Sequence, residues 1–162
     1  MTDVTMSSPL PVIEDATTAD LAAIREMLHE YAAWLKVDLC FQNFEAEVAG
    51  LPGDYAPPPG ALLIARIEGY PAGMVALRRK DESRGEMKRL FVREAARGMR
   101  LGRTLAERII VEARTRGYRE MVLDTLPVMQ DAQRLYVALG FRDIEPYYQS
   151  PITGTRFMAL PL

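Results

Sequence analysis

Residues 86–102, EMKRLFVREAARGMRLG, decide the fold of this 162-residue chain. Residues 86–92 favour a strand, and residues 93–100 form a charged loop. From residue 101 onward, apolar residues recur at helical spacing, which predicts a helix to about residue 116 that stops at Gly117. The stretch is therefore a strand, a loop and a helix in direct succession.

The loop before this helix has the composition of an anion-binding turn. Backbone N–H groups at a helix N-terminus are unpaired, and the helix dipole adds positive charge. Gly98 allows close approach of the backbone, and Arg97, Arg100 and Arg103 add charge. On its own, the pattern fits a tight turn with solvated arginines equally well. It has neither the G-x-x-x-x-G-K-[ST] spacing of a Walker A loop nor G-x-G-x-x-G.

The segments on either side predict a mixed sheet. Strands are expected over residues 10–15, 61–67, 70–78, 86–92, 120–124, 141–144 and 155–160. Helices are expected over residues 19–35, 41–49, 101–116 and 129–139. A three-strand meander followed by βαβ units implies an α/β (α+β) fold with helices on both faces of the sheet.

Two stretches resemble the motifs of the GNAT superfamily of acetyltransferases. Residues 90–103, LFVREAARGMRLGR, look like its coenzyme A-binding motif, and residues 131–141, DAQRLYVALGF, resemble its second signature. The order of the predicted elements matches that fold over about residues 10–160. The resemblance implies a mostly antiparallel central sheet whose strands splay at the coenzyme A site. We expect one such domain over residues 10–162, after a disordered tail at residues 1–9.

The loop departs from the family pattern at one position. That pattern is Gln/Arg-x-x-Gly-x-Gly/Ala, in which Arg97 and Gly102 fit the ends while Arg100 occupies the middle glycine position. A side chain there either obstructs the pyrophosphate or contacts it as a cation. Arginine pairs well with phosphate, which favours the contact.

The resemblance implies acetyl-CoA as the acetyl donor and assigns residues to it. The main chain of Leu90, Phe91 and Val92 would pair with the pantetheine arm, and a backbone N–H near Leu90 would stabilise the oxyanion. The pyrophosphate would lie against Arg97, Gly98, Met99, Arg100, Leu101, Gly102, Arg103 and Thr104.

Two residues are the catalytic candidates. Tyr136 matches the family tyrosine that protonates the departing thiolate, although its place on an apolar helix stripe also fits a core residue. Glu86 is the candidate base, since strand alternation puts it on the same face as Leu90. A solvated carboxylate at Glu86, with a water chain as the base, remains open. His29 is the only histidine and no G-x-S-x-G is present, which favours direct attack by the amine in a ternary complex.

The acceptor is expected to be a small molecule with a primary amine, which the sequence does not identify. Lys88 shares the face of Glu86 and could receive a carboxylate of the acceptor. Phe41 and Phe44 fit a core role equally well. The candidates for the acceptor site are Phe41, Gln42, Phe44, Glu45, Tyr55, Lys88, Tyr147 and Tyr148.

The composition argues against other classes of partner. The net charge is −2 with mixed signs, which does not indicate nucleic acid, and no apolar run of ~20 residues suggests a membrane span. One cysteine and the absence of a signal peptide favour a cytoplasmic protein. No metal-binding cluster is predicted, and a homodimer stays open. The alternative function is a non-catalytic acyl-CoA sensor, which would need neither Tyr136 nor Glu86.

Overall fold

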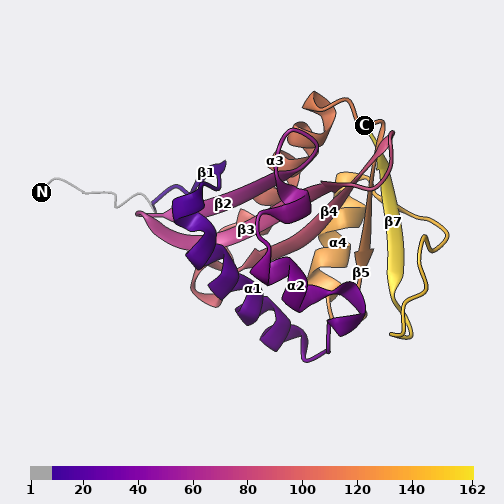
Figure 1. The fold of residues 1–162 in the computed structure, drawn as a ribbon, viewed down its shortest axis with the longest axis horizontal. Helices are drawn as coiled ribbons and strands as arrows, with labels where there is room; N and C mark the ends of the chain where they lie inside the picture. The colour runs from indigo at the N-terminus through magenta and orange to yellow at the C-terminus, as the bar shows by residue number, and fades with distance from the viewer. Residues whose placement is uncertain (1–8) are drawn as a thin grey trace, which may run out of the picture.

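The strands form one seven-stranded sheet in the order β1-β2-β3-β4-β5-β7-β6 (Figure 1). This computed structural model describes residues 9–162, so most of the predicted tail lies outside the described residues. Every neighbouring pair is antiparallel except β4–β5, which is parallel. The strands are β1 Val12–Asp15, β2 Ala61–Ile67, β3 Tyr70–Arg79, β4 Arg84–Val92, β5 Glu120–Thr125, β6 Arg142–Asp143 and β7 Arg156–Pro161.

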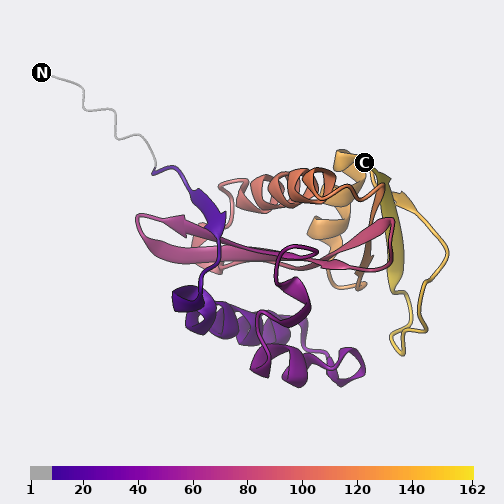
Figure 2. The same ribbon diagram turned by 45° about the horizontal axis from the view of Figure 1, so that its top comes forward.

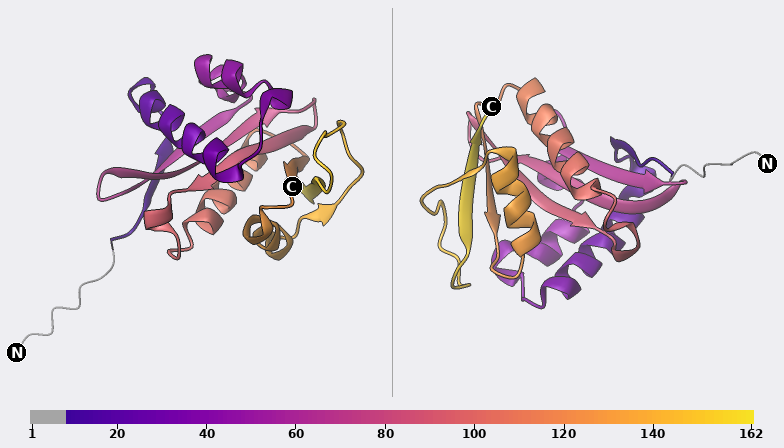
Figure 3. Two further views of the ribbon diagram at one scale, coloured as in Figure 1. Left: turned by 90° about the horizontal axis from the view of Figure 1, so that it is seen from below. Right: turned by 180° about the vertical axis from the view of Figure 1, so that it is seen from behind.

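Helices cover both faces of this sheet. Figure 2 shows α1 and α2 on one face and α3 and α4 on the other, and Figure 3 shows α3 and α4 side by side. The helices are α1 Leu21–Leu35, α2 Phe44–Ala49, α3 Leu101–Thr115 and α4 Gln130–Leu139. The predicted mixed, mostly antiparallel sheet with helices on both faces is confirmed.

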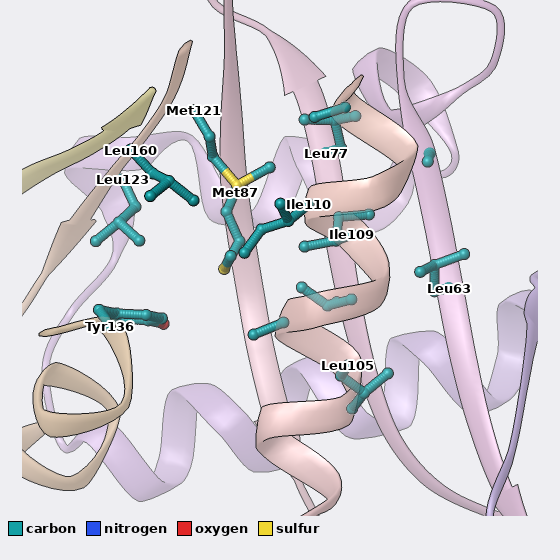
Figure 4. Close-up of a cluster of buried hydrophobic side chains, with 14 of the residues drawn as sticks. Leu63, Leu77, Met87, Leu105, Ile109, Ile110, Met121, Leu123, Tyr136 and Leu160 are labelled. Carbon is teal, nitrogen blue, oxygen red and sulfur yellow. The ribbon is translucent and has the colours of Figure 1, made fainter. Parts of the chain in front are cut away.

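Two apolar clusters hold the three layers together. On the α3 face, Leu105 and Ile109 pack against Met87 and Met121 of the sheet, with Tyr136 of α4 at the margin (Figure 4). On the other face, α1 and α2 pack against the opposite surface of β3 and β4. Burial of this kind is the main contribution to the stability of such layers.

The second helix was predicted over residues 41–49, which places its start three residues too early. Residues Cys40–Gln42 form a single 3-10 turn, and α2 starts only at Phe44. Between them Asn43 has φ +55°, a left-handed conformation that interrupts any continuous α-helix.

The sheet splits between β4 and β5. These strands pair only at their beginnings, up to Glu86 opposite Val122. Beyond Glu86, β4 has no partner on its β5 side within the described residues. The splay expected from the resemblance is therefore present.

A β-bulge changes the faces of β4. Phe91 pairs with Met74 and Lys88 with Ala76, so β4 advances three residues where β3 advances two. Arg89 has φ +60° at this point. The bulge turns Leu90 toward the α3 cluster. The expectation that Glu86 and Leu90 share one face is wrong, because simple alternation ends at the bulge.

Candidate active site

A groove of about 300 Å³ follows the unpaired half of β4 to the N-terminus of α3. No side chain within residues 9–162 caps this helix, so the N–H groups of its first turn lack side-chain partners in the described part of the chain. Eight of the predicted coenzyme A residues line the groove: Leu90, Phe91, Val92, Arg97, Gly98, Arg100, Leu101 and Gly102. The sequence motif and the groove thus coincide.

Three predicted cofactor residues do not line the groove. Met99 lies beside the groove in the loop. Arg103 is bound to Glu107, with Nε 2.7 Å from Oε1. The Thr104 hydroxyl donates to the carbonyl of Arg100 at 3.1 Å. Arg97 does line the groove, and its guanidinium lies over the Trp34 ring at 5.6 Å.

The loop has a left-handed residue at each of two positions. Gly98 has φ +88°, and nothing lies within 4 Å of the position a Cβ would take. Arg100 has φ +57° immediately before α3. A left-handed conformation costs a residue with a side chain about 1–2 kcal/mol. This geometry gives a physical reason for a glycine at the position that Arg100 occupies.

An inner cavity adjoins the groove at the point where β4 and β5 part. Tyr31, Leu90 and Met129 line both spaces. The inner cavity holds only about 20 Å³, enough for about one water molecule. Its polar residues are Tyr31, Gln42, Lys88, Arg89, Asp124 and Tyr136.

Tyr136 lines this inner cavity. The residue is 4% exposed, and its ring packs against Phe141 with centroids 5.7 Å apart. Burial raises the pKa of the Tyr136 hydroxyl above its ordinary value, and the Asp124 charge adds to the effect. The hydroxyl therefore keeps its proton across the neutral range.

Asp124, at the end of β5, is the carboxylate of the inner cavity. It accepts hydrogen bonds from the Tyr148 hydroxyl at 2.6 Å and from Gln42 Nε2 at 3.2 Å, and Lys88 Nζ lies 3.4 Å away. Burial alone would raise the pKa of Asp124. The positive charge of Lys88 and these hydrogen bonds outweigh burial, so the pKa is lowered and the group stays ionised. Lys88 itself has a pKa lowered by burial.

The sequence reading missed Asp124. The sequence predicts the strand EMVLD at residues 120–124, but no role was assigned to the acid at its end. A carboxylate among buried strand residues needs cationic or hydrogen-bonding partners, and that was the available signal.

Glu86 lies outside the inner cavity. It is 1% exposed, and its two oxygens are bound by Arg78 Nε at 2.7 Å and by the Tyr147 hydroxyl at 2.6 Å. The structure therefore brings Tyr136 together with Asp124, not with Glu86.

The predicted acceptor residues separate into groups. Gln42 and Lys88 line the inner cavity, while Phe41 and Tyr148 line an open groove beside the loop between β6 and β7. Tyr147 is bound to Glu86.

The remaining acceptor candidates, Phe44, Glu45 and Tyr55, do not line a common cavity. Phe44 is a buried core residue under the Arg89 guanidinium, and Glu45 is exposed and lines none of these cavities. Tyr55 is buried and lines a further cavity beside Arg78.

A split sheet and a groove that runs from the gap between its strands to the N-terminus of α3, with an inner cavity adjoining it, are the features expected of an acyl-CoA-dependent transferase. Residues 21–141 match the model of the Acetyltransferase (GNAT) family. The chain is 41% identical over 145 residues to an uncharacterized N-acetyltransferase of Schizosaccharomyces pombe, covering 88% of this chain and 89% of that protein.

Two further similarities agree with this family. The chain is 32% identical over 100 residues to the N-acetylaspartate synthetase of Danio rerio, covering 60% of this chain and 36% of that protein. The structure of yncA from Salmonella typhimurium, with its cofactor acetyl-CoA, matches with a TM-score of 0.71 at 24% identity over 93% of each chain.

The chain belongs to the GNAT acetyltransferase family, and it is an N-acetyltransferase that uses acetyl-CoA as donor. Within residues 9–162, none of the helices combines the length and the apolar character needed to cross a membrane. The same residues contain no group of three or more His, Cys, Asp or Glu side chains that could hold a metal ion.

Proposed function

We propose that this enzyme acetylates the primary amine of a small acceptor by direct attack of the amine on the donor. The observation that carries the proposal is the meeting of Tyr136 and Asp124 in one inner cavity at the end of the cofactor groove. A proton donor for the departing sulfur and a carboxylate base for the amine are two groups that accelerate acyl transfer to an amine.

The groove fits the cofactor at both ends. The uncapped N-terminus of α3, with Gly98 and Arg100 beside it, suits a pyrophosphate. The unpaired edge of β4 from Leu90 to Val92 is free to pair with the pantetheine arm. When bound, acetyl-CoA supplies an acetyl thioester with a good leaving group.

Asp124 takes the role that the sequence reading gave to Glu86. It is ionised and lines the cavity, so it can hold the incoming ammonium group. The ammonium group must first lose a proton, to Asp124 or through it to water, because only the neutral amine has the lone pair that attacks the acetyl carbon. Bond formation then makes a remaining N–H acidic, and Asp124 is the carboxylate lining the cavity that can take this second proton once it has passed the first to water. Glu86 instead holds Tyr147 in place.

Tyr136 donates a proton to the departing sulfur. Its raised pKa keeps the hydroxyl protonated before the sulfur leaves. This proton transfer gives a modest gain, because a thiolate of pKa ~8.5 already leaves readily.

A covalent acetyl-cysteine route has little support. Cys40 lines neither the groove nor the inner cavity. A hydrogen bond to Asp38 raises the pKa of its thiol, which makes the thiolate scarcer.

The acceptor is proposed to approach between Phe41 and the loop between β6 and β7. These parts line one open groove, and Tyr148 connects it to Asp124. The Danio rerio relative is named for making N-acetylaspartate, an N-acetylated amino acid, so amino acids are the first acceptors to test. A non-catalytic sensor would have no use for the inner cavity.

The test is release of free thiol from acetyl-CoA with a panel of amines, in wild type and in Tyr136→Phe. The proposal expects amine-dependent release that Tyr136→Phe reduces while acetyl-CoA still binds. Binding of acetyl-CoA without thiol release from any amine would favour the sensor.

A further inference from the structure

A second cavity, of about 280 Å³, lies between α2, the turn Gly53–Tyr55 and β3. It adjoins the inner cavity, since Gln42 lines both. It is more than ten times as large as the inner cavity, which holds about 20 Å³. Most of an acceptor molecule therefore has to be accommodated outside the inner cavity.

The Tyr55 hydroxyl in this second cavity has no hydrogen-bond partner among the described residues. The residue is 2% exposed, and burial raises the pKa of the hydroxyl, so it remains a donor. The Glu47 carboxylate lies close enough to raise this pKa further but does not form a hydrogen bond with the hydroxyl. Buried polar atoms without partners are rare in native proteins, and each implies a missing water or ligand.

Gln42, which lines both cavities, also has a buried side-chain atom without a hydrogen-bond partner among the described residues. Its Nε2 donates to Asp124 at 3.2 Å, while its buried Oε1 has no partner within residues 9–162. An acceptor ammonium held by Asp124 would supply the missing donor. Two unpartnered buried atoms thus lie along one path.

Arg78 is the cationic residue that lines the second cavity, beside the carboxylates of Glu47 and Asp54. Within the described chain only its Nε is hydrogen-bonded, to Glu86 at 2.7 Å, so both terminal nitrogens remain available. Both oxygens of Glu47 are occupied by Arg89 at 3.0 Å, and Asp54 is exposed at the rim. The half-buried guanidinium of Arg78 and the buried hydroxyl of Tyr55 are therefore the two donors that the lining of this cavity offers to a carboxylate.

We infer that this cavity binds a carboxylate of the acceptor, so that the substrate is an amino acid rather than a polyamine or a simple alkylamine. The inference rests on the proposed function and names its substrate class. The carboxylate lies against Arg78 and Tyr55, and the amine reaches Asp124 past Gln42.

The two proposed subsites start from neighbouring positions of the same pair of strands. Lys88, the partner of Asp124, pairs with Ala76, and the backbone of Arg78 lies two residues further along β3, roughly 7 Å away. This backbone spacing is compatible with a small acceptor that carries both an amine and a carboxylate. Lys88 is a poorer carboxylate site, because Asp124 already occupies it and the inner cavity is too small for a second carboxylate.

The test uses Tyr55→Phe and four matched pairs of amines: glycine and glycinamide, β-alanine and its amide, aspartate and asparagine, glutamate and glutamine. The wild type should prefer at least one acid over its amide. In Tyr55→Phe, the ratio of kcat/KM for that acid to its amide should fall about 10- to 100-fold, the loss expected for one hydrogen bond to a charge. The melting temperature should not fall, because no protein hydrogen bond is lost.

Tyr70→Phe, at a 76% exposed tyrosine, is the matched control and should leave the ratio unchanged. Binding of each acid is measured in parallel by thermal shift with desulfo-coenzyme A present. Equal use of acids and amides, an unchanged ratio in Tyr55→Phe, or no binding of any acid overturns the inference and indicates that water fills the cavity. Acetylation of amines without preference for acids leaves the proposed function intact, whereas absence of any amine acetylation refutes that function itself.

Discussion

The Tyr148 hydroxyl donates a hydrogen bond of 2.6 Å to Asp124 and so joins the loop between β6 and β7 to the inner cavity. Tyr148 also lines the open groove proposed for acceptor entry. On the proposed route, an acceptor entering there would meet the tyrosine that holds the carboxylate. The proposal therefore implies that acceptor binding and the position of Asp124 are coupled through this contact.

Asp124→Asn should lower kcat at least a hundredfold, because a positioned general base contributes 10²–10⁴-fold to such a step. Affinity for acetyl-CoA, measured by calorimetry, should stay within twofold, since Asp124 does not line the cofactor groove. Glu86→Gln is the matched variant, and its loss of kcat should be the smaller one. A larger loss in Glu86→Gln would return the base to Glu86.

Lys88→Met should move the acid limb of the kcat/KM profile to higher pH. In the wild type, Lys88 helps to hold the pKa of Asp124 below its usual range against the effect of burial. Without that positive charge burial dominates, the pKa rises, and the carboxylate is protonated at a higher pH. Lys36→Met, at an exposed lysine, serves as the control.

The same pair has a consequence for stability. Because the folded pKa of Asp124 is lowered, its contribution is present above the unfolded pKa of ~3.9 and is lost as pH falls through the folded pKa. In Lys88→Met, where burial instead raises the folded pKa above the unfolded value, the sign reverses: ionised Asp124 destabilises the fold at neutral pH, and the variant should regain stability relative to the wild type as pH falls through the raised pKa. Melting temperatures recorded from pH 3 to pH 7 measure this, and curves that run parallel would show that Lys88 does not control Asp124.

The local features of this fold could be predicted from sequence because short stretches contain their signals. The strand–loop–helix around Gly98 and the helix of Tyr136 follow from periodicity and stop residues alone. The partners of Asp124 could not be predicted in this way, since Gln42 is 82 residues away and Lys88 is 36 residues away. The bulge at Arg89 could not be predicted for a similar reason, because a bulge is defined only by the pairing of β4 with β3.

Tyr136→Phe should lower kcat about tenfold or more and leave the melting temperature and acetyl-CoA affinity nearly unchanged. The ring and its packing on Phe141 remain, while the proton donor is removed. Tyr118→Phe is the contrasting variant, since it removes a 2.6 Å hydrogen bond to the Pro59 carbonyl. It should cost about 1 kcal/mol of stability and leave kcat unchanged. An unchanged kcat in Tyr136→Phe would assign Tyr136 to the core.

Arg100→Gly should weaken acetyl-CoA binding while it relieves backbone strain. Arg100 lines the groove at the uncapped start of α3, where its guanidinium can contact the pyrophosphate. Losing one charge-assisted contact should cost about 1.5–3 kcal/mol of binding free energy, and less at high salt. The φ of +57° suits glycine, so up to about 1 kcal/mol of stability should be gained.

The two effects of Arg100→Gly have opposite signs, which makes the variant decisive. Calorimetry at two salt concentrations gives the change in acetyl-CoA affinity, and thermal unfolding without ligand gives the change in stability. Arg103→Ala is the control, because Arg103 is bound to Glu107 and does not line the groove, so its affinity should stay near that of the wild type. Tighter binding by Arg100→Gly would show that this side chain obstructs the pyrophosphate and that the loop functions better with the glycine of the family pattern.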